Sequence, residues 1–173
     1  YSLSENATST TTRVFTTKLD EGGEVSPFLH HGVQVGDVVE LSNPYGDIEL
    51  DQSQAPIVLA TAGIGCTPSA SVLQTLAAES SDRQVMVLHA ERTEEDWALK
   101  EQMRQSLSSL PNADLTLWLE DATGATADLA PRTGFMDLAA VDLPADAKVY
   151  LCGPLPFMKA VRSQAIAAGI PAT

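Results

Sequence analysis

The stretch Ile57-Val-Leu-Ala-Thr-Ala-Gly-Ile-Gly-Cys-Thr-Pro-Ser69 joins a strand pattern to a glycine turn and a helix start. Its first five residues are apolar or small and do not alternate with polar ones, which predicts a short buried strand. Two glycines follow, and Thr67-Pro68 then indicates a helix, with Thr67 as the N-cap and Pro68 at the first helical position. The stretch is therefore typical of a strand–turn–helix unit in an α/β fold.

Such a unit can hold a phosphate group. The N–H groups in the first turn of a helix have no partner within the helix, and the positive end of the helix dipole favours an anion there. Glycines also let the backbone approach a ligand where a Cβ atom would collide. No third glycine sits where the usual G-x-G-x-x-G fingerprint has one, however. On this stretch alone, a tight turn without a ligand is an equally good interpretation.

Composition narrows the class of protein. The chain has 173 residues, enough for one good core or for one domain with part of another. Its 23 acidic and 10 basic side chains give a net charge of −13, which argues against a nucleic-acid partner. No apolar run approaches the ~20 residues of a membrane span, and no secretion signal is present. Cys66 and Cys152 follow no metal-ligand or disulfide pattern. We therefore expect a cytoplasmic protein with no membrane partner.

The order of expected elements divides the chain in two. Residues 1–50 have antiparallel β character, with strands expected near 13–18 and 38–42, a short helix opened by Ser26-Pro27, a turn at 43–47 and an extended segment at 48–50. Residues 51–56 are expected to be a linker. Strands then alternate with helices, which predicts a parallel sheet covered on both faces over 57–173. The strands are expected at 57–61, 84–90, 114–119 and 148–152, and the helices at 68–78, 94–110 and 157–168. Because the sequence begins within a strand-like segment and stops after a helix, we expect a fragment of a longer polypeptide.

A second glycine turn lies in Val149-Tyr-Leu-Cys-Gly-Pro-Leu-Pro-Phe-Met158. Again a buried strand ends at a glycine, and prolines introduce a helix. In parallel sheets ligands bind beyond the carboxyl ends of the strands. Two such turns at one edge could hold a dinucleotide from both sides, which makes a nucleotide site the better interpretation of the pair.

These motifs resemble a known family. Ala62-Gly-Ile-Gly-Cys-Thr-Pro68 together with Tyr150-Leu-Cys-Gly-Pro154 resembles the NAD(P)H-binding domain of the ferredoxin–NADP reductase superfamily, in which an antiparallel FAD-binding β-barrel comes first. Gly22-Gly-Glu-Val-Ser-Pro-Phe-Leu-His30 and Gly134-Phe-Met-Asp-Leu138 are similar to the reductase region of flavohaemoglobins. The resemblance runs from Tyr1 to Pro171. It implies part of an FAD-binding barrel over 1–50 and an NAD(P)H-binding α/β domain over 57–173.

The resemblance also implies a set of flavin-binding residues. Tyr1 would stack on the isoalloxazine ring, as aromatic faces do, and the Ser2 hydroxyl would bond the flavin near N5. The FAD pyrophosphate would meet backbone N–H groups at the start of a short helix, at Gly23, Glu24, Val25 and Ser26.

For the pyridine dinucleotide, the resemblance implies the two glycine turns and the helix starts after them. The residues are Gly63, Ile64, Gly65, Cys66, Thr67, Pro68, Cys152, Gly153, Pro154 and Phe157. Cys152 would border the nicotinamide where it meets the flavin, so Tyr1, Ser2 and Cys152 are the candidate catalytic residues.

The end of the second strand is the expected place to select the dinucleotide. Glu91 could accept a hydrogen bond from a ribose 2′-hydroxyl and would repel a 2′-phosphate, whereas Arg92 would do the reverse. This favours NADH, with NADPH as the alternative. The acidic run Glu94-Glu-Asp96 also suits the N-terminus of any solvated helix.

The resemblance therefore implies an FAD-dependent NAD(P)H oxidoreductase that passes electrons to a haem in a globin domain outside this chain, as in nitric oxide dioxygenases. Two alternatives stay open. One is a reductase component that serves an iron–sulfur or oxygenase partner, and the other is a non-catalytic nucleotide-binding remnant. His30 and His31 lack ligand partners at suitable spacing, so no metal site is expected in this chain.

Overall fold

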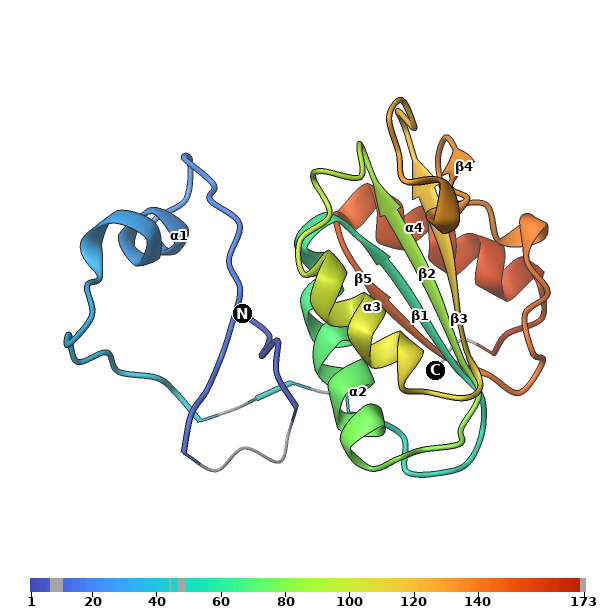
Figure 1. Cartoon of the computed structure of the whole chain (residues 1–173), viewed down its shortest axis with the longest axis horizontal. Coiled ribbons are helices and arrows are strands. Elements are labelled where there is room, and N and C mark those ends of the chain that lie inside the picture. The colour runs from blue at the N-terminus through green and yellow to red at the C-terminus, as the bar shows by residue number, and fades with distance from the viewer. Residues whose placement is uncertain (7–10, 44, 47–48, 172–173) are drawn as a thin grey trace.

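A parallel five-stranded sheet forms the centre of the computed structural model, which describes residues 1–6, 11–43, 45–46 and 49–171. The strands are β1 (Ile57–Ala62), β2 (Val85–Glu91), β3 (Ala113–Leu119), β4 (Arg132–Thr133) and β5 (Lys148–Cys152). Their order is β4-β3-β2-β1-β5, and every pairing is parallel (Figure 1). The expected α/β fold with a parallel sheet is confirmed. The turn expected at 43–47 and the extended segment at 48–50 lie partly outside the described residues.

Helices cover both faces of the sheet. Helices α2 (Cys66–Ala78) and α3 (Lys100–Ser108) pack on one face, and α4 (Leu155–Ala167) packs on the other (Figure 1). Alternate residues of β1 enter the two cores, with Leu59 facing α2 and α3, and Val58 facing α4. Burial on both faces is the reason why this strand reads as a continuous apolar run.

Helix α2 begins earlier than the sequence predicts. A 3₁₀ turn at Gly63–Gly65 leads directly into the helix, and the N–H of Cys66 already donates to the carbonyls of Gly63 and Ile64. The N-cap is Gly65, so the prediction of Thr67 as N-cap was wrong; its hydroxyl donates to the Ile64 carbonyl at 3.2 Å. Pro68 fits in the first turn, where a missing N–H costs no helical bond.

The helix expected at 94–110 is shorter and starts later. Leu99 has a left-handed backbone with φ of +60°, which separates the acidic run from α3. Helix α4 begins at Leu155, two residues earlier than expected. Strand β4 lies in a stretch that gave no strand signal, and it pairs Trp118 with Arg132. Short 3₁₀ turns occupy Ala127–Leu129 and Leu138–Ala140.

The first fifty residues contain little regular structure. Helix α1 (Val25–Pro27) continues into a π-helical turn, Phe28–Gly32, which confirms a short helix near Ser26-Pro27. The strands expected at 13–18 and 38–42 are not formed; in the described part of this region the β pairing is one antiparallel bridge between Leu3 and Phe15. A strand requires a hydrogen-bonded neighbour, and Val38 is fully exposed without one.

A buried arginine attaches residues 51–56 to the sheet domain. Arg83 is 5% exposed, and it donates to the carbonyls of Ala55 and Asp51 and pairs with the Asp51 carboxylate at 3.4 Å. The hydroxyl of Tyr150 accepts from the Asp51 N–H at 2.8 Å. Among the described residues, no helix is long and apolar enough to cross a membrane.

Candidate functional site

The two glycine turns meet at the carboxyl edge of the sheet. Strands β1 and β5 are neighbours, and their register pairs Thr61 with Cys152. A Cβ atom on Gly65 would lie 2.4 Å from the Cys152 carbonyl oxygen and 2.7 Å from the Gly153 nitrogen. Such distances are far inside van der Waals contact, so the two backbones can approach this closely only because residue 65 is glycine.

The second turn depends on glycine in the same way. A Cβ atom on Gly153 would lie 2.9 Å from the Phe157 ring and 3.1 Å from the Ala62 carbonyl oxygen. Phe157, in the first turn of α4, is half-buried against this backbone. The expectation that both turns lie at one edge of the sheet is therefore confirmed, and they are in direct contact.

Glu91, the last residue of β2, lies next to the first glycine turn. Gly63 has φ of +56°, and a Cβ atom there would be 3.7 Å from Glu91 Oε1. Glu91 is 8% exposed, and its Oε2 accepts from the Arg92 N–H at 3.1 Å. Burial raises the pKa of Glu91, although the Arg92 N–H and the charge of Lys18 act in the opposite direction. The carboxylate and the glycine turn thus share one corner of the edge.

Arg92 is paired within its own loop. Its guanidinium pairs with the Asp96 carboxylate at 3.1 Å, and the Thr93 hydroxyl donates to the other oxygen of Asp96 at 3.1 Å. The Thr93 hydrogen bond is the main reason why the pKa of Asp96 is lowered. The positive charge of Arg92 is thus compensated within the loop after β2.

Neither cysteine is a thiolate at neutral pH. Cys66 is fully buried, and its thiol donates to the Ala98 carbonyl at 3.3 Å; burial raises its pKa to about 12. Cys152 is half-buried, and burial also raises its pKa. Packing explains Cys66, whereas Cys152 ends β5 at the edge where the glycine turns meet.

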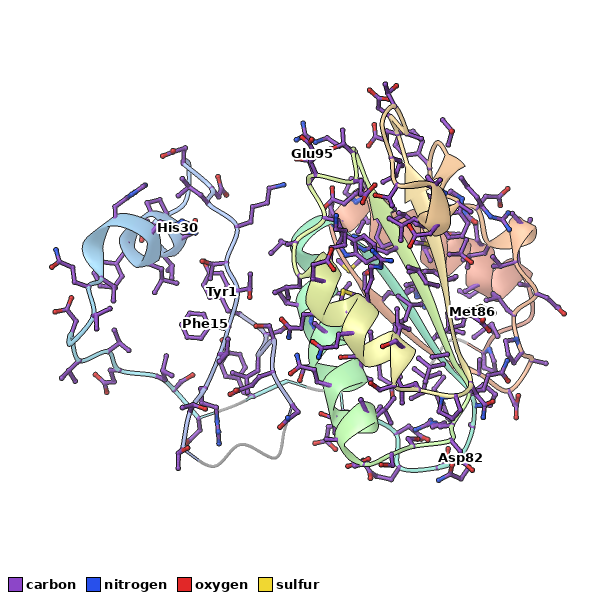
Figure 2. The ribbon with its side chains drawn as sticks, in the orientation of Figure 1. Tyr1, Phe15, His30, Asp82, Met86 and Glu95 are labelled. Atoms are coloured by element: carbon purple, nitrogen blue, oxygen red, sulfur yellow. The ribbon has the colours of Figure 1, made fainter. Side chains whose placement is uncertain are left out.

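The candidate flavin residues lie in the N-terminal segment. Tyr1 is 74% exposed, and Ser2 is exposed as well. Figure 2 shows Tyr1 beside Phe15, in the segment between α1 and the sheet domain, in agreement with the bridge at Leu3 and Phe15. No described contact joins Tyr1 or Ser2 to the glycine turns.

The turn at residues 23–26 is held together from within. The N–H of Gly23 donates to the Asp20 carbonyl at 2.9 Å. Ser26 is buried, and its hydroxyl accepts from the Asp20 N–H at 3.0 Å and donates to the Asp20 carbonyl. Glu24 forms the N-cap of α1, and its side chain makes no capping bond. The Ser26 hydroxyl is thus engaged within the turn, and a ligand would have to meet the backbone.

Sequence reasoning missed the role of Glu94. Its carboxylate accepts from the Thr126 N–H at 2.6 Å, from the Thr126 hydroxyl at 2.7 Å and from the Lys100 ammonium at 3.0 Å. The bonds from Thr126 and Lys100 lower the pKa of Glu94 to about 2. Glu94 therefore ties the loop after β2 to the loop after β3. Its partner lies 32 positions away, and no local pattern indicates such a contact.

A buried histidine lies near the carboxyl end of β2 and bonds to the neighbouring strand β1. His89 Nδ1 bonds the Thr61 hydroxyl at 2.8 Å, and the imidazole lies 5.0 Å from the Trp97 ring. Burial lowers the pKa of His89 to about 3, so the ring is neutral. Within the described residues, His89 Nε2 and Trp97 Nε1 have no hydrogen-bond partner. This pair belongs to the core beneath the edge.

The opposite end of the sheet, where the strands begin, contains a polar cavity of about 420 Å³, bordered by Asp82, Gln84 and Asn112. Figure 2 places Asp82 at that end and Glu95 at the carboxyl end. The glycine turns, Glu91 and Cys152 all belong to the carboxyl end, where ligands of parallel α/β sheets bind.

Comparison with known proteins identifies the fold family. The oxidoreductase NAD-binding domain family matches residues 59–163, more than half of the chain. The flavohemoprotein of Chromobacterium violaceum is 38% identical over 156 residues, which are 87% of this chain and 38% of that protein. The chain thus spans well under half the length of that relative.

Two solved structures share the architecture. A flavohemoglobin from Malassezia yamatoensis with bound FAD and heme is 33% identical, with a TM-score of 0.79 over 90% of this chain and 40% of that one. The flavohem-like FAD/NAD-binding domain of a nitric oxide dioxygenase from Vibrio cholerae is 32% identical, with a TM-score of 0.87 over 99% of this chain and 72% of that one. The chain therefore belongs to the family of flavohaemoglobin-type FAD/NAD-binding domains, and its α/β part is an oxidoreductase NAD-binding domain.

Proposed function

We propose that this chain is the reductase region of a flavoprotein that takes electrons from NADH through FAD and passes them to a haem outside the chain. The observation that carries the proposal is the backbone contact between the turns at Gly65 and Gly153, at the carboxyl edge of a parallel sheet. Such an edge is where dinucleotides bind in α/β folds. The proposed domains are a partial FAD-binding domain at 1–50, a linker at 51–56 and the NAD(P)H-binding domain at 57–173.

The residues at this edge fit a dinucleotide. Helix α2 has no acidic side chain in its own first turn, so the positive end of its dipole is not neutralised from within the helix. Gly63 adopts a left-handed backbone, which turns the chain sharply between β1 and the helix. We assign the pyrophosphate to the turn Gly63–Pro68 and the nicotinamide to Cys152, Gly153 and Pro154, beside Phe157.

The candidate site residues would bind and orient the two cofactors. When bound, FAD supplies the redox chemistry, because it accepts a hydride from NADH and releases electrons singly. The exposed ring of Tyr1 offers a flat face for stacking, and Ser2 offers a hydroxyl. The backbone of residues 23–26, where the Gly23 N–H is already bonded to the Asp20 carbonyl, would hold the FAD phosphates. The Cys152 thiol is protonated at neutral pH, so it brings no charge to the nicotinamide.

The charges after β2 favour NADH over NADPH. The Glu91 carboxylate is buried beside Gly63, where it would repel a 2′-phosphate. Arg92, the cation that could bind such a phosphate, is paired with Asp96. We therefore assign discrimination to Glu91 and to the pair Arg92–Asp96 together.

Two relatives support a haem as the acceptor, and the cytoplasmic location expected from the sequence is kept as part of the proposal. One similar structure is described as containing bound FAD and heme, and another as part of a nitric oxide dioxygenase. By analogy, the complete protein would use the electrons from this chain at a haem in a globin domain and oxidise nitric oxide to nitrate. This analogy also favours a haem over the iron–sulfur partner considered above.

An anaerobic titration tests the proposed function. The purified protein, loaded with FAD, should show flavin absorbance that bleaches on addition of one equivalent of NADH. A bound flavin that stays oxidised with excess NADH would refute the proposal. It would leave a nucleotide-binding protein without reductase activity.

The dinucleotide preference has a separate test. The ratio of kcat/KM for NADH to that for NADPH should exceed one, and Glu91→Ala should lower it about tenfold, equivalent to about 1.4 kcal/mol. Asp96→Ala, which releases Arg92, should lower the ratio further. An unchanged ratio in both variants would show that this corner does not select the cofactor.

A further inference from the structure

Ser4 belongs to the N-terminal segment and is buried where that segment meets helices α2 and α3 of the sheet domain. It is 1% exposed, and its carbonyl oxygen accepts from two glutamine side chains, Gln74 at 2.9 Å and Gln102 at 2.6 Å. These glutamines belong to different helices, α2 and α3. Two amide donors on one oxygen occupy both of its lone pairs.

The next residue is held in the same manner. The Ser71 hydroxyl, also on α2, donates to the Glu5 carbonyl at 2.5 Å. We call Ser71, Gln74 and Gln102 the carbonyl clamp. On the far side of the segment, the Ser4 N–H donates to the Val14 carbonyl at 2.9 Å. The segment at residues 4–5 is therefore fixed between residue 14 and the two helices.

The clamp connects the two candidate cofactor sites through short paths. Ser4 follows Tyr1 by three positions, so at most about 11 Å of extended chain separates them. Helix α2 starts at the glycine turn, and Ser71 lies five residues after Cys66, about 7.5 Å along the helix axis. One helix thus carries the dinucleotide turn at its start and holds the flavin-binding segment with its side chains.

Distance control matters for the proposed reaction. Hydride transfer requires the reacting atoms at about 3–3.5 Å, and a displacement of 1 Å can cost about 100-fold in rate. Other contacts of residues 3–5 join this segment to residues 14–16: Leu3 forms a bridge with Phe15, the Ser4 hydroxyl bonds the Thr16 hydroxyl at 3.0 Å, and the Glu5 carboxylate accepts from the Val14 N–H at 2.9 Å. Glutamines on helix surfaces are ordinarily solvated, and here two of them bind one peptide carbonyl of a distant segment.

We propose that the carbonyl clamp is a positioning device, in which Ser71, Gln74 and Gln102 set the distance between the flavin held by Tyr1 and Ser2 and the nicotinamide at Cys152 and Gly153. This inference rests on the proposed function. None of the three residues touches a reacting atom.

The test uses the FAD-loaded protein with Gln74→Met and Gln102→Met combined. Methionine keeps the length and helix propensity of glutamine but cannot donate a hydrogen bond. Gln105→Met is the matched control. Gln105 is an exposed glutamine on α3, the helix that carries Gln102, and it does not bind Ser4. Ser71→Thr keeps the hydroxyl of the third clamp residue and should behave as wild type, whereas Ser71→Ala removes it.

Two measurements are made on each variant. Amide hydrogen exchange at Ser4 should become at least about tenfold faster in the double variant, because the segment opens more often. The rate of flavin reduction at saturating NADH should fall at least about tenfold, while the Kd for NADH changes less than about twofold. Gln105→Met should change neither quantity.

The outcomes separate the two claims. Unchanged exchange in the double variant overturns the clamp. Faster exchange with an unchanged rate of flavin reduction overturns its positioning role. If NADH fails to reduce the wild-type flavin, the proposed function fails and the positioning role with it, while the exchange result still decides whether the contacts hold the segment.

Discussion

Replacing Gly65 by alanine is the most demanding test of the contact between the two turns. The new Cβ atom would lie 2.4 Å from the Cys152 carbonyl oxygen, and ordinary contact begins at 3.4 Å, so the backbones must separate by about 1 Å. The obstructing atoms all belong to the backbone of residues 152 and 153, so no side-chain rotation relieves the clash. Gly65 has φ of −61°, which alanine adopts freely, so the effect is steric alone.

The magnitude follows from overpacking. Forced displacement of a packed backbone costs about 1–3 kcal/mol. The smaller entropy of the unfolded alanine chain returns about 0.4–1 kcal/mol. Taking the middle of each range, the variant should be less stable by about 1.3 kcal/mol, a fall in Tm of about 3–5 °C for a chain of this length. Since the nucleotide turn moves as well, the Kd for NADH should rise at least about tenfold.

Thermal unfolding and an NADH titration measure these two effects. Gly22→Ala is the control, because its Cβ would meet only the Asp20 carboxylate at an ordinary 3.5 Å. If Gly65→Ala matched the wild type in both Tm and NADH affinity, the two turns could not be packed as described.

Two further predictions concern two buried polar side chains, His89 and Arg83. His89 has a folded-state pKa of about 3 against 6.5 in the unfolded chain, so the unfolded state binds the extra proton between these values. The contribution of neutral His89 to the free energy of unfolding should therefore be fully present above pH 6.5 and fall by about 1.4 kcal/mol per pH unit as the pH drops toward 3. In urea unfolding, His89→Leu should show a shallower fall with pH. An identical slope in the variant and the wild type would exclude His89 as the source of the fall. Arg83→Met leaves the half-buried carbonyls of Asp51 and Ala55 without their donor, which should cost about 1–3 kcal/mol in urea unfolding. A loss below about 0.5 kcal/mol would mean that Arg83 does not hold residues 51–56.

The sheet could be predicted because its signals are local. Strand β1 is buried on both faces and reads as an apolar run, and the glycines that end β1 and β5 mark where the chain turns. Since parallel strands end at one edge, the placement of both glycine turns at that edge followed from the order of elements, whereas the pairing of β1 with β5, which brings Gly65 and Gly153 together, comes from the structure. That meeting is the feature on which the candidate site depends.

The predicted helix boundaries were wrong where two local signals competed. Thr67-Pro68 is a valid helix start, but the 3₁₀ turn at Gly63–Gly65 had already aligned the backbone, and the helix began at Cys66. The acidic residues after β2 also suit a helix start. In the structure Glu94 binds the Thr126 loop instead.

Long-range contacts had no sequence signal at all. Gln74 and Gln102 are ordinary helix-surface residues until the fold brings the Ser4 carbonyl between them. Likewise, the β-rich pattern at 38–42 shows propensity, and a strand forms only where a neighbouring strand supplies hydrogen bonds. These features depend on which segments the fold places side by side.

The central claim is that one dinucleotide occupies both glycine turns. An NMR titration of the ¹⁵N-labelled chain with NADH tests it directly, because the amides of Gly63, Gly65 and Gly153 each report on their own turn. The account predicts that all three resonances shift along one binding curve, with a common Kd. Shifts confined to one turn, or centred on Asp82 and Asn112 at the opposite edge, would contradict it.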